Sequence, residues 1–171
     1  MKFISNCSHV INWDDIIKNI YELPGKVLTY SPSGNDLDLQ WQAAGYKHYD
    51  PAIEWIQYWS GKDFDENIAN IFGNFVGATP YYTFISRIRP GKFIPFHEDR
   101  MKDQDLIPGN PVRYTCFISK PTNGHLSLVE DRVVYNAQQG DIWKWPNPSA
   151  QHSGVNVADR DKFMFNFWGY E

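Results

Sequence analysis

His97 and Asp99 are the two side chains whose types and spacing best suit a chemical role. They lie two positions apart in the segment Phe96-His97-Glu98-Asp99, and alternate side chains of an extended chain point to the same face. An imidazole nitrogen and a carboxylate oxygen can therefore reach one point and bind one metal ion. Because a lone His-x-Asp pair is more often structural, a third ligand from elsewhere in the chain is needed to support this interpretation.

His152 is the best candidate for that third ligand. It follows a Gly140-Asp141 turn and precedes the last predicted hairpin, so the fold could return it to His97 and Asp99. Two histidines and one carboxylate on one octahedral face leave the other metal positions open, which is the arrangement that non-haem Fe(II) oxygenases use. We therefore predict that His97, Asp99 and His152 are metal ligands and catalytic residues.

Short segments rich in β-branched and aromatic residues dominate the chain after Gly77, and Gly, Pro, Asn and Asp separate them. Eight such segments within under ~90 residues favour a β-sandwich or jelly roll. We expect strands at residues 81–89, 92–97, 112–119, 125–129, 132–135, 141–145, 151–157 and 162–168.

The first third of the chain has apolar residues at helical spacing. The clearest case is Trp13, Ile16, Ile17 and Ile20, ended by Pro24-Gly25. We expect helices at residues 12–22, 50–59 and 65–75, packed outside one sheet, with the Asp50-Pro51 pair opening the second. Together, the helical and strand patterns predict one domain over residues 1–171, with a helical part at 1–79 and a β core at 80–169.

Composition narrows the classes of protein. The 171 residues carry a formal charge of −4, so no basic excess points to nucleic acid or an anionic membrane surface. No segment approaches the ~20 apolar residues of a membrane helix, and the N-terminal segment lacks the apolar core of a signal peptide. The two cysteines cannot form a disulfide scaffold. We expect a cytoplasmic protein, and its oligomeric state is left open.

Residues 84–99 resemble a strand, Pro-Gly turn and metal-binding His of the aspartyl/asparaginyl β-hydroxylases and, more broadly, of the prolyl-hydroxylase-like 2-oxoglutarate oxygenases. The second half of that pattern is matched by Gly140-Asp141, His152, Val155, Asn156, Lys162 and Trp168. The resemblance covers residues 81–169 and implies a double-stranded β-helix, that is, a cupin-like jelly roll. It also implies Fe(II) and 2-oxoglutarate as cofactors.

The resemblance assigns roles one residue at a time. His97, Asp99 and His152 match the iron ligands, and Asp99 agrees better with the broader oxygenase family, because many Asp/Asn hydroxylases lack that carboxylate. Ser86 matches a hydroxyl on the distal carboxylate of 2-oxoglutarate, with an ordinary strand serine as the alternative. Arg113 matches an Arg that pairs with a cosubstrate carboxylate.

The basic anchor for the distal carboxylate is Lys162 or Arg160. Counting ten residues from His152 reaches Lys162, whereas counting back from Trp168 favours Arg160. We prefer Lys162, because residues 159–161 resemble a turn. The period of two then places Lys162, Met164, Asn166 and Trp168 inward and the phenylalanines between them toward the helices.

Other candidates are weaker. The loop at residues 100–111 is long and polar, and such loops beside metal sites often contact substrates; Arg100 and Lys102, together with Arg87, are candidate contacts. His125 could approach the site, whereas His9 and His48 have no partner pattern.

The resemblance implies a dioxygenase that uses O2 and hydroxylates a C–H bond of an amino-acid, peptide, protein or small-metabolite substrate. Desaturation stays open, and the carboxylate of Asp99 argues against halogenation. Two other classes compete: a cupin-type metalloenzyme without 2-oxoglutarate, which would normally show a His-x-His pair, and a non-catalytic jelly-roll binding module.

Overall fold

The computed structural model describes residues 1–99, 108–120 and 122–171, and these residues form eleven strands and three helices. The first third contains β1 (Lys2–Asn6), α1 (Trp13–Tyr21), β2 (Lys26–Thr29), α2 (Asp36–Ala43), β3 (Glu54–Trp59) and α3 (Asn67–Val76). The rest contains β4 (Thr79–Ile88), β5 (Lys92–His97), β6 (Pro111–Phe117), β7 (His125–Val129), β8 (Arg132–Val134), β9 (Asp141–Lys144), β10 (His152–Asn156) and β11 (Lys162–Tyr170). Within these residues no helix has the length and apolar character that crossing a membrane requires.

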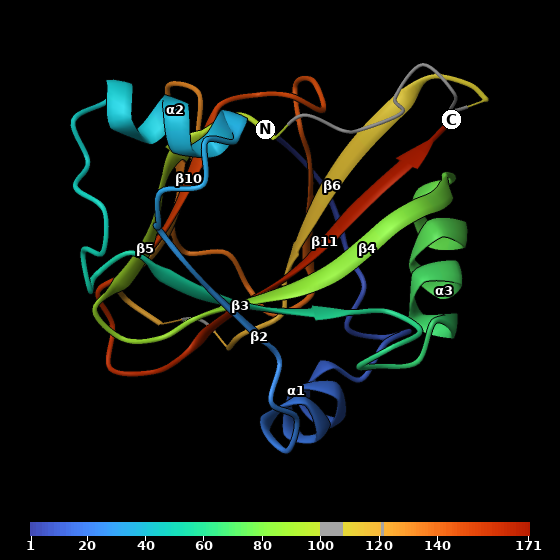
Figure 1. The fold of residues 1–171 in the computed structure, drawn as a ribbon. Coiled ribbons are helices and arrows are strands. Elements are labelled where there is room, and N and C mark those ends of the chain that lie inside the picture. The colour runs from blue at the N-terminus through green and yellow to red at the C-terminus, as the bar shows by residue number, and fades with distance from the viewer. Residues whose placement is uncertain (100–107, 121) are drawn as a thin grey trace.

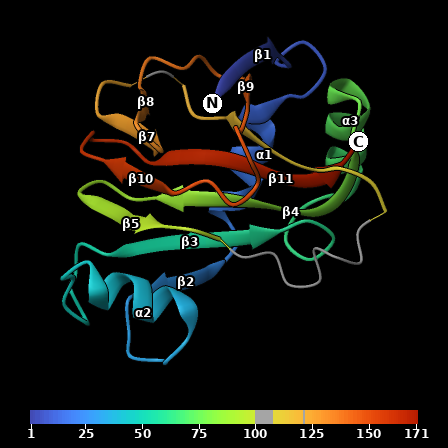
Figure 2. The ribbon, with the colours of Figure 1, turned by 90° about the horizontal axis from the view of Figure 1, so that it is seen from above.

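The strands make two sheets. The larger has the order β1-β9-β6-β11-β4-β3-β2, and the smaller has the order β5-β10-β7-β8. Figure 1 shows α1 and α3 outside the larger sheet and α2 beside β5, and Figure 2 shows α2 and β2 at the same edge of the molecule. After β4 the chain passes repeatedly from one sheet to the other, so residues far apart in sequence meet between the sheets.

The eight strands expected after Gly77 match β4 to β11, with each end within two residues of its expected position. The alternation expected for the last strand is also confirmed. Phe163, Phe165 and Phe167 pack in the core between the larger sheet and helices α1 and α3. Met164 belongs to a second core between the two sheets.

The first and third predicted helices are confirmed as α1 and α3. Asn12 caps α1, because its side chain accepts a hydrogen bond from the Asp15 amide. Gly77 ends α3 in the left-handed conformation with φ 73°, which glycine adopts without steric cost.

The prediction of a helix at residues 50–59 is wrong, because β3 occupies Glu54–Trp59 and pairs with β2 and β4. Asp50 does not cap a helix; its carboxylate accepts a hydrogen bond from the Ala52 amide in a turn. Ile56 and Tyr58 pack against the helix-side core, while Trp55 packs between the sheets. A strand buried on both faces lacks the polar alternation that would have identified it.

Candidate metal centre

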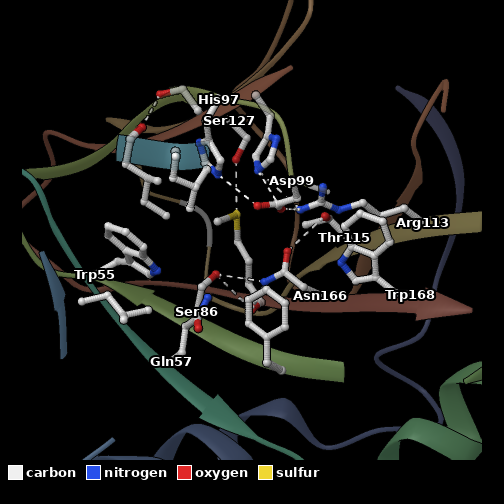
Figure 3. A pocket seen from close by; sticks show the side chains of 18 of the residues that line it. Trp55, Gln57, Ser86, His97, Asp99, Arg113, Thr115, Ser127, Asn166 and Trp168 are labelled. Atoms are coloured by element: carbon white, nitrogen blue, oxygen red, sulfur yellow. Dashed lines mark hydrogen bonds and ion pairs between the residues drawn. The ribbon is translucent and has the colours of Figure 1, made fainter. Parts of the chain in front are cut away.

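His97, Asp99 and His152 form one cluster, and Figure 3 shows His97 and Asp99 side by side at the cavity. His97 ends β5 and His152 begins β10, and the two residues are direct partners across the antiparallel pair. Asp99 lies between them, with Oδ1 3.3 Å from His97 Nε2 and Oδ2 3.4 Å from His152 Nε2. One donor atom from each of the three residues lies within 4.8 Å of the others, so a single ion could contact all three.

Backbone carbonyls orient both imidazoles. His97 Nδ1 lies 2.7 Å from the Pro95 carbonyl oxygen, and His152 Nδ1 lies 3.1 Å from that of Ala150. Each Nδ1 therefore carries the proton and donates it, which leaves the lone pair of Nε2 directed toward Asp99. Burial, followed by the positive charge of Arg113, lowers the pKa of His152 to about 4, so its imidazole is neutral near pH 7.

Arg113 is the positive side chain of this site. Its guanidinium lies 2.7 Å from Asp99 Oδ2 and is held between the rings of Trp145 and Trp168, at 3.7 and 4.2 Å from their centroids. Burial of the Asp99 carboxylate opposes ionisation, but Arg113 and His152 outweigh it and hold the pKa of Asp99 well below its usual range. The Arg113 Nε–H is buried without a partner among the described residues.

The donor set fits a divalent transition metal. Two imidazole nitrogens and one ionised carboxylate match the ligand set of non-haem Fe(II) sites, and the hydrogen bonds to both Nδ1 atoms supply the orientation that such ligands need. The three side chains occupy one side of the site, and the cavity described below adjoins them.

Lys162 and Arg160 differ sharply in position. Arg160 is exposed, whereas the Lys162 side chain is buried between the sheets and donates to the Leu126 carbonyl and, over 2.8 Å, to Ser127 Oγ. Burial lowers the pKa of Lys162 to about 7, and no carboxylate of the described residues is paired with it. Lys162 stands behind the wall of the main cavity, and Ser127, to which it donates, lines that cavity.

Ser86 lines the same cavity from β4. Its hydroxyl accepts a hydrogen bond of 3.0 Å from Asn166 Nδ2 and lies 3.5 Å from the Met164 carbonyl. Thr115 on β6, which β11 separates from β4, accepts a hydrogen bond from Trp145 Nε1. These hydroxyls give the interior of the sandwich polar contacts next to the three candidate ligands.

The other histidines lie elsewhere. His125 Nε2 contacts the Arg160 carbonyl, His48 pairs with Asp38 and His9 packs on Phe75. Arg87 faces away from the cavity and pairs with Asp161 beside α1, so its interpretation as a substrate contact is wrong. Arg100 and Lys102, the other candidate contacts, lie outside the described residues.

A cavity of about 700 Å³ adjoins the three candidate ligands. One part of its wall comes from the N-terminal third, as expected for the pocket lining, although the sequence did not identify the individual residues; they are Met1, Leu28, Thr29, Tyr30, Ser31, Ser33, Asn35, Leu37, Asp38, Trp41, Trp55 and Gln57. The α2 helix begins at an Asn35 cap, and such a residue is a sequence signal for the start of a helix. Its apolar residues do not recur at helical spacing, and nothing in the sequence places Trp41 against His97, where their rings lie 5.6 Å apart.

No family model matches the chain, and no curated protein matches it. Several solved structures, however, match the chain. An oxidoreductase of the 2OG-Fe(II) oxygenase family from Burkholderia pseudomallei is 14% identical, with a TM-score of 0.53 over 91% of this chain and 78% of that one. A prolyl-4-hydroxylase from Pseudomonas putida is 13% identical, with a TM-score of 0.49 over 94% and 100%. The collagen prolyl hydroxylase of Paramecium Bursaria Chlorella virus-1 is 16% identical, with a TM-score of 0.49 over 84% and 93%. The first of these shows that the chain has the fold of that oxidoreductase, and at such identity the likeness extends to the fold alone.

Proposed function

We propose that this protein is an Fe(II)- and 2-oxoglutarate-dependent dioxygenase that hydroxylates a C–H bond of an amino-acid, peptide, protein or small-metabolite substrate. The observation that carries the proposal is the convergence of His97, Asp99 and His152, with both imidazoles held by backbone carbonyls, beside a large cavity. The alternation of β4 to β11 between two sheets supports a double-stranded β-helix within a single domain.

The three residues would hold Fe(II) through two Nε2 atoms and one carboxylate oxygen. When bound, iron and 2-oxoglutarate supply the oxidation of a C–H bond by O2, with succinate and CO2 as co-products. The protein keeps His152 neutral and Asp99 ionised, so these two donors are in their ligating forms near pH 7. Arg113 fixes the carboxylate of Asp99 and keeps it ionised.

Lys162 would anchor the distal carboxylate of 2-oxoglutarate. An ammonium buried without a carboxylate partner is costly, and an anionic ligand would remove that cost. Reaching it requires the carboxylate to enter between Ser127 and Met164, which form the cavity wall in front of Lys162. Ser86 would donate its hydroxyl to the same carboxylate, and Arg113, which also lines the cavity, would supply a guanidinium donor to a cosubstrate carboxylate nearer the metal.

The test is stoichiometric turnover. Purified protein supplied with Fe(II), 2-oxoglutarate and O2 should form succinate, and omitting either the metal or the O2 should prevent this. Untargeted mass spectrometry of extracts treated with the protein should then reveal a metabolite or peptide that gains one oxygen atom only when 2-oxoglutarate is present. Absence of succinate from protein that binds Fe(II) would contradict the proposal.

A further inference from the structure

The cavity is larger than the cosubstrate needs. Its volume of about 700 Å³ is in the range of sites that hold drug-sized ligands, and 2-oxoglutarate has only ten non-hydrogen atoms. One end lies at His97, Asp99 and His152, and the other is bounded by β2, α2 and β3. We call this second part the N-terminal arm and define it by Tyr30, Trp41, Trp55 and Gln57.

Aromatic rings form the walls of the N-terminal arm. Trp41 packs edge-to-face against Tyr30 and Trp55, with ring centroids 5.2 and 5.9 Å apart. Trp41 also contacts the ring of His97, so the arm begins directly beside the candidate metal ligands. Such walls favour a flat π-system over a flexible chain, because a ring gains both buried area and edge-to-face contacts.

Two polar groups of the arm have no partner among the described residues. The Trp41 indole N–H is buried and unpaired. The Gln57 side chain makes no hydrogen bond in the described part of the chain, and it projects next to Ser86, its partner across β3 and β4 (Figure 3). An amide side chain both donates and accepts hydrogen bonds, so Gln57, which lines the cavity, is suited to a ligand that offers both an acceptor and a donor.

The charged side chains of the described cavity wall are already engaged. Asp38 accepts hydrogen bonds from the amides of Ser33 and Gly34 and pairs with His48 at 2.7 Å. Asp99 and Arg113 pair with each other. A charged group that entered the arm would lose its hydration without gaining an unpaired counter-ion from these side chains, which is unfavourable. A zwitterionic free amino acid is therefore a poor fit.

We propose that the N-terminal arm binds an uncharged aromatic ring with a hydrogen-bonding substituent, held by Trp41 and Trp55 and read by Gln57. This assignment rests on the proposed function, because it makes the ring part of the substrate that is oxidised. Gln57 is then a specificity-determining residue, and it is neither a metal ligand nor a cosubstrate contact.

The test compares three probes of nearly equal shape, namely neutral benzamide, anionic benzoate and cationic benzamidinium. Their affinities are measured by ligand-observed NMR against the full chain loaded with Fe(II) and saturating 2-oxoglutarate under nitrogen, so that benzoate cannot bind in the cosubstrate site. We expect benzamide to bind at least tenfold more tightly than either ion. Gln57→Glu should reverse the order in favour of benzamidinium, because it adds a negative charge to the arm.

Gln42→Glu is the matched control, since Gln42 is exposed on α2 and the substitution changes the net charge equally. It should leave the order unchanged. Gln57→Met adds no charge, so it should weaken the binding of benzamide without strengthening that of benzamidinium. It also provides a second test if the Glu variant does not fold. Equal binding of the three probes, or an unchanged order in Gln57→Glu, would overturn the assignment. The visible charge-transfer band of the iron–2-oxoglutarate complex is recorded on the same samples, so loss of that band in wild type identifies failure of the proposed function instead.

Discussion

Replacing Lys162 by methionine should stabilise the ligand-free protein and at the same time remove its affinity for 2-oxoglutarate. Lys162 is 1% exposed, and among the described residues its ammonium has only a backbone carbonyl and the Ser127 hydroxyl as partners. A residue kept for binding an anion is expected to cost stability when the anion is absent. Methionine fills a similar volume without a charge.

The magnitude follows from the pKa of the ammonium. Burial lowers it from 10.5 to about 7, which at pH 7 costs the folded state on the order of 4 kcal/mol. Losing the two hydrogen bonds of the ammonium offsets about 2 kcal/mol of the gain. Ligand-free Lys162→Met should therefore be about 2 kcal/mol more stable than wild type at pH 7.

The advantage should depend on pH. Between the folded-state pKa of about 7 and the value of 10.5 for the unfolded chain, the unfolded chain binds more protons at Lys162, so wild-type stability rises with pH. The variant lacks this contribution, and its advantage should vanish at about pH 9. Urea unfolding of both proteins at about pH 7 and about pH 9 measures the difference directly.

Binding supplies the second half of the test. Anaerobic titration should show that Lys162→Met binds 2-oxoglutarate at least about a hundredfold more weakly, because a carboxylate left unpaired in this interior costs ~3 kcal/mol or more. Fe(II) affinity should be retained. The reasoning would be refuted if Lys162→Met were less stable than wild type at pH 7, if the difference in their free energies of unfolding did not change with pH, and if the variant bound 2-oxoglutarate normally.

The remaining predictions concern the neighbouring residues. His97→Ala and Asp99→Ala should each abolish succinate formation, including turnover without substrate, since each loses a metal ligand; unchanged turnover in both would contradict the ligand assignment. Arg160→Ala should change the apparent KM for 2-oxoglutarate only slightly, and a large rise would instead identify Arg160 as the anchor. Arg113→Lys should weaken Fe(II) binding about 10- to 100-fold in a metal titration, because an ammonium cannot keep both the stacking and the contact to Asp99; unaltered affinity would show that Arg113 does not support the ligand. Phe165→Ala should lower the free energy of unfolding by about 3–5 kcal/mol in urea, because Phe165 is fully buried against Trp13 and Phe72, and a loss under about 1 kcal/mol would contradict that packing.

The β core was predictable because its signals are local. In strands β4 to β11 successive side chains point to opposite faces, and turn residues lie at the strand ends. The ordered spacing of His97, Asp99 and His152 identified the three residues that the structure brings together. The buried position of Lys162 and the exposed one of Arg160 also agree with the preference for Lys162, although its role as anchor stays a proposal.

The N-terminal third was predictable only in part. Ile53, Ile56 and Trp59 recur every third residue and suggested a helix, but β3 buries both of its faces and so hides the period of two. The edge strands β1 and β2 are short, and α2 has little amphipathic pattern. The contact of Trp41 with His97 arises from tertiary packing, and no local pattern encodes it.

The most direct test of the central claim is the visible spectrum of the protein mixed with Fe(II) and 2-oxoglutarate under nitrogen. If His97, Asp99 and His152 hold the metal and leave room for a bidentate cosubstrate, a weak metal-to-ligand charge-transfer band should appear, and His152→Ala should lack it. A cupin-type metalloenzyme without 2-oxoglutarate, or a binding module, would give no such band. Wild-type protein that binds Fe(II) and 2-oxoglutarate without developing the band would contradict the account.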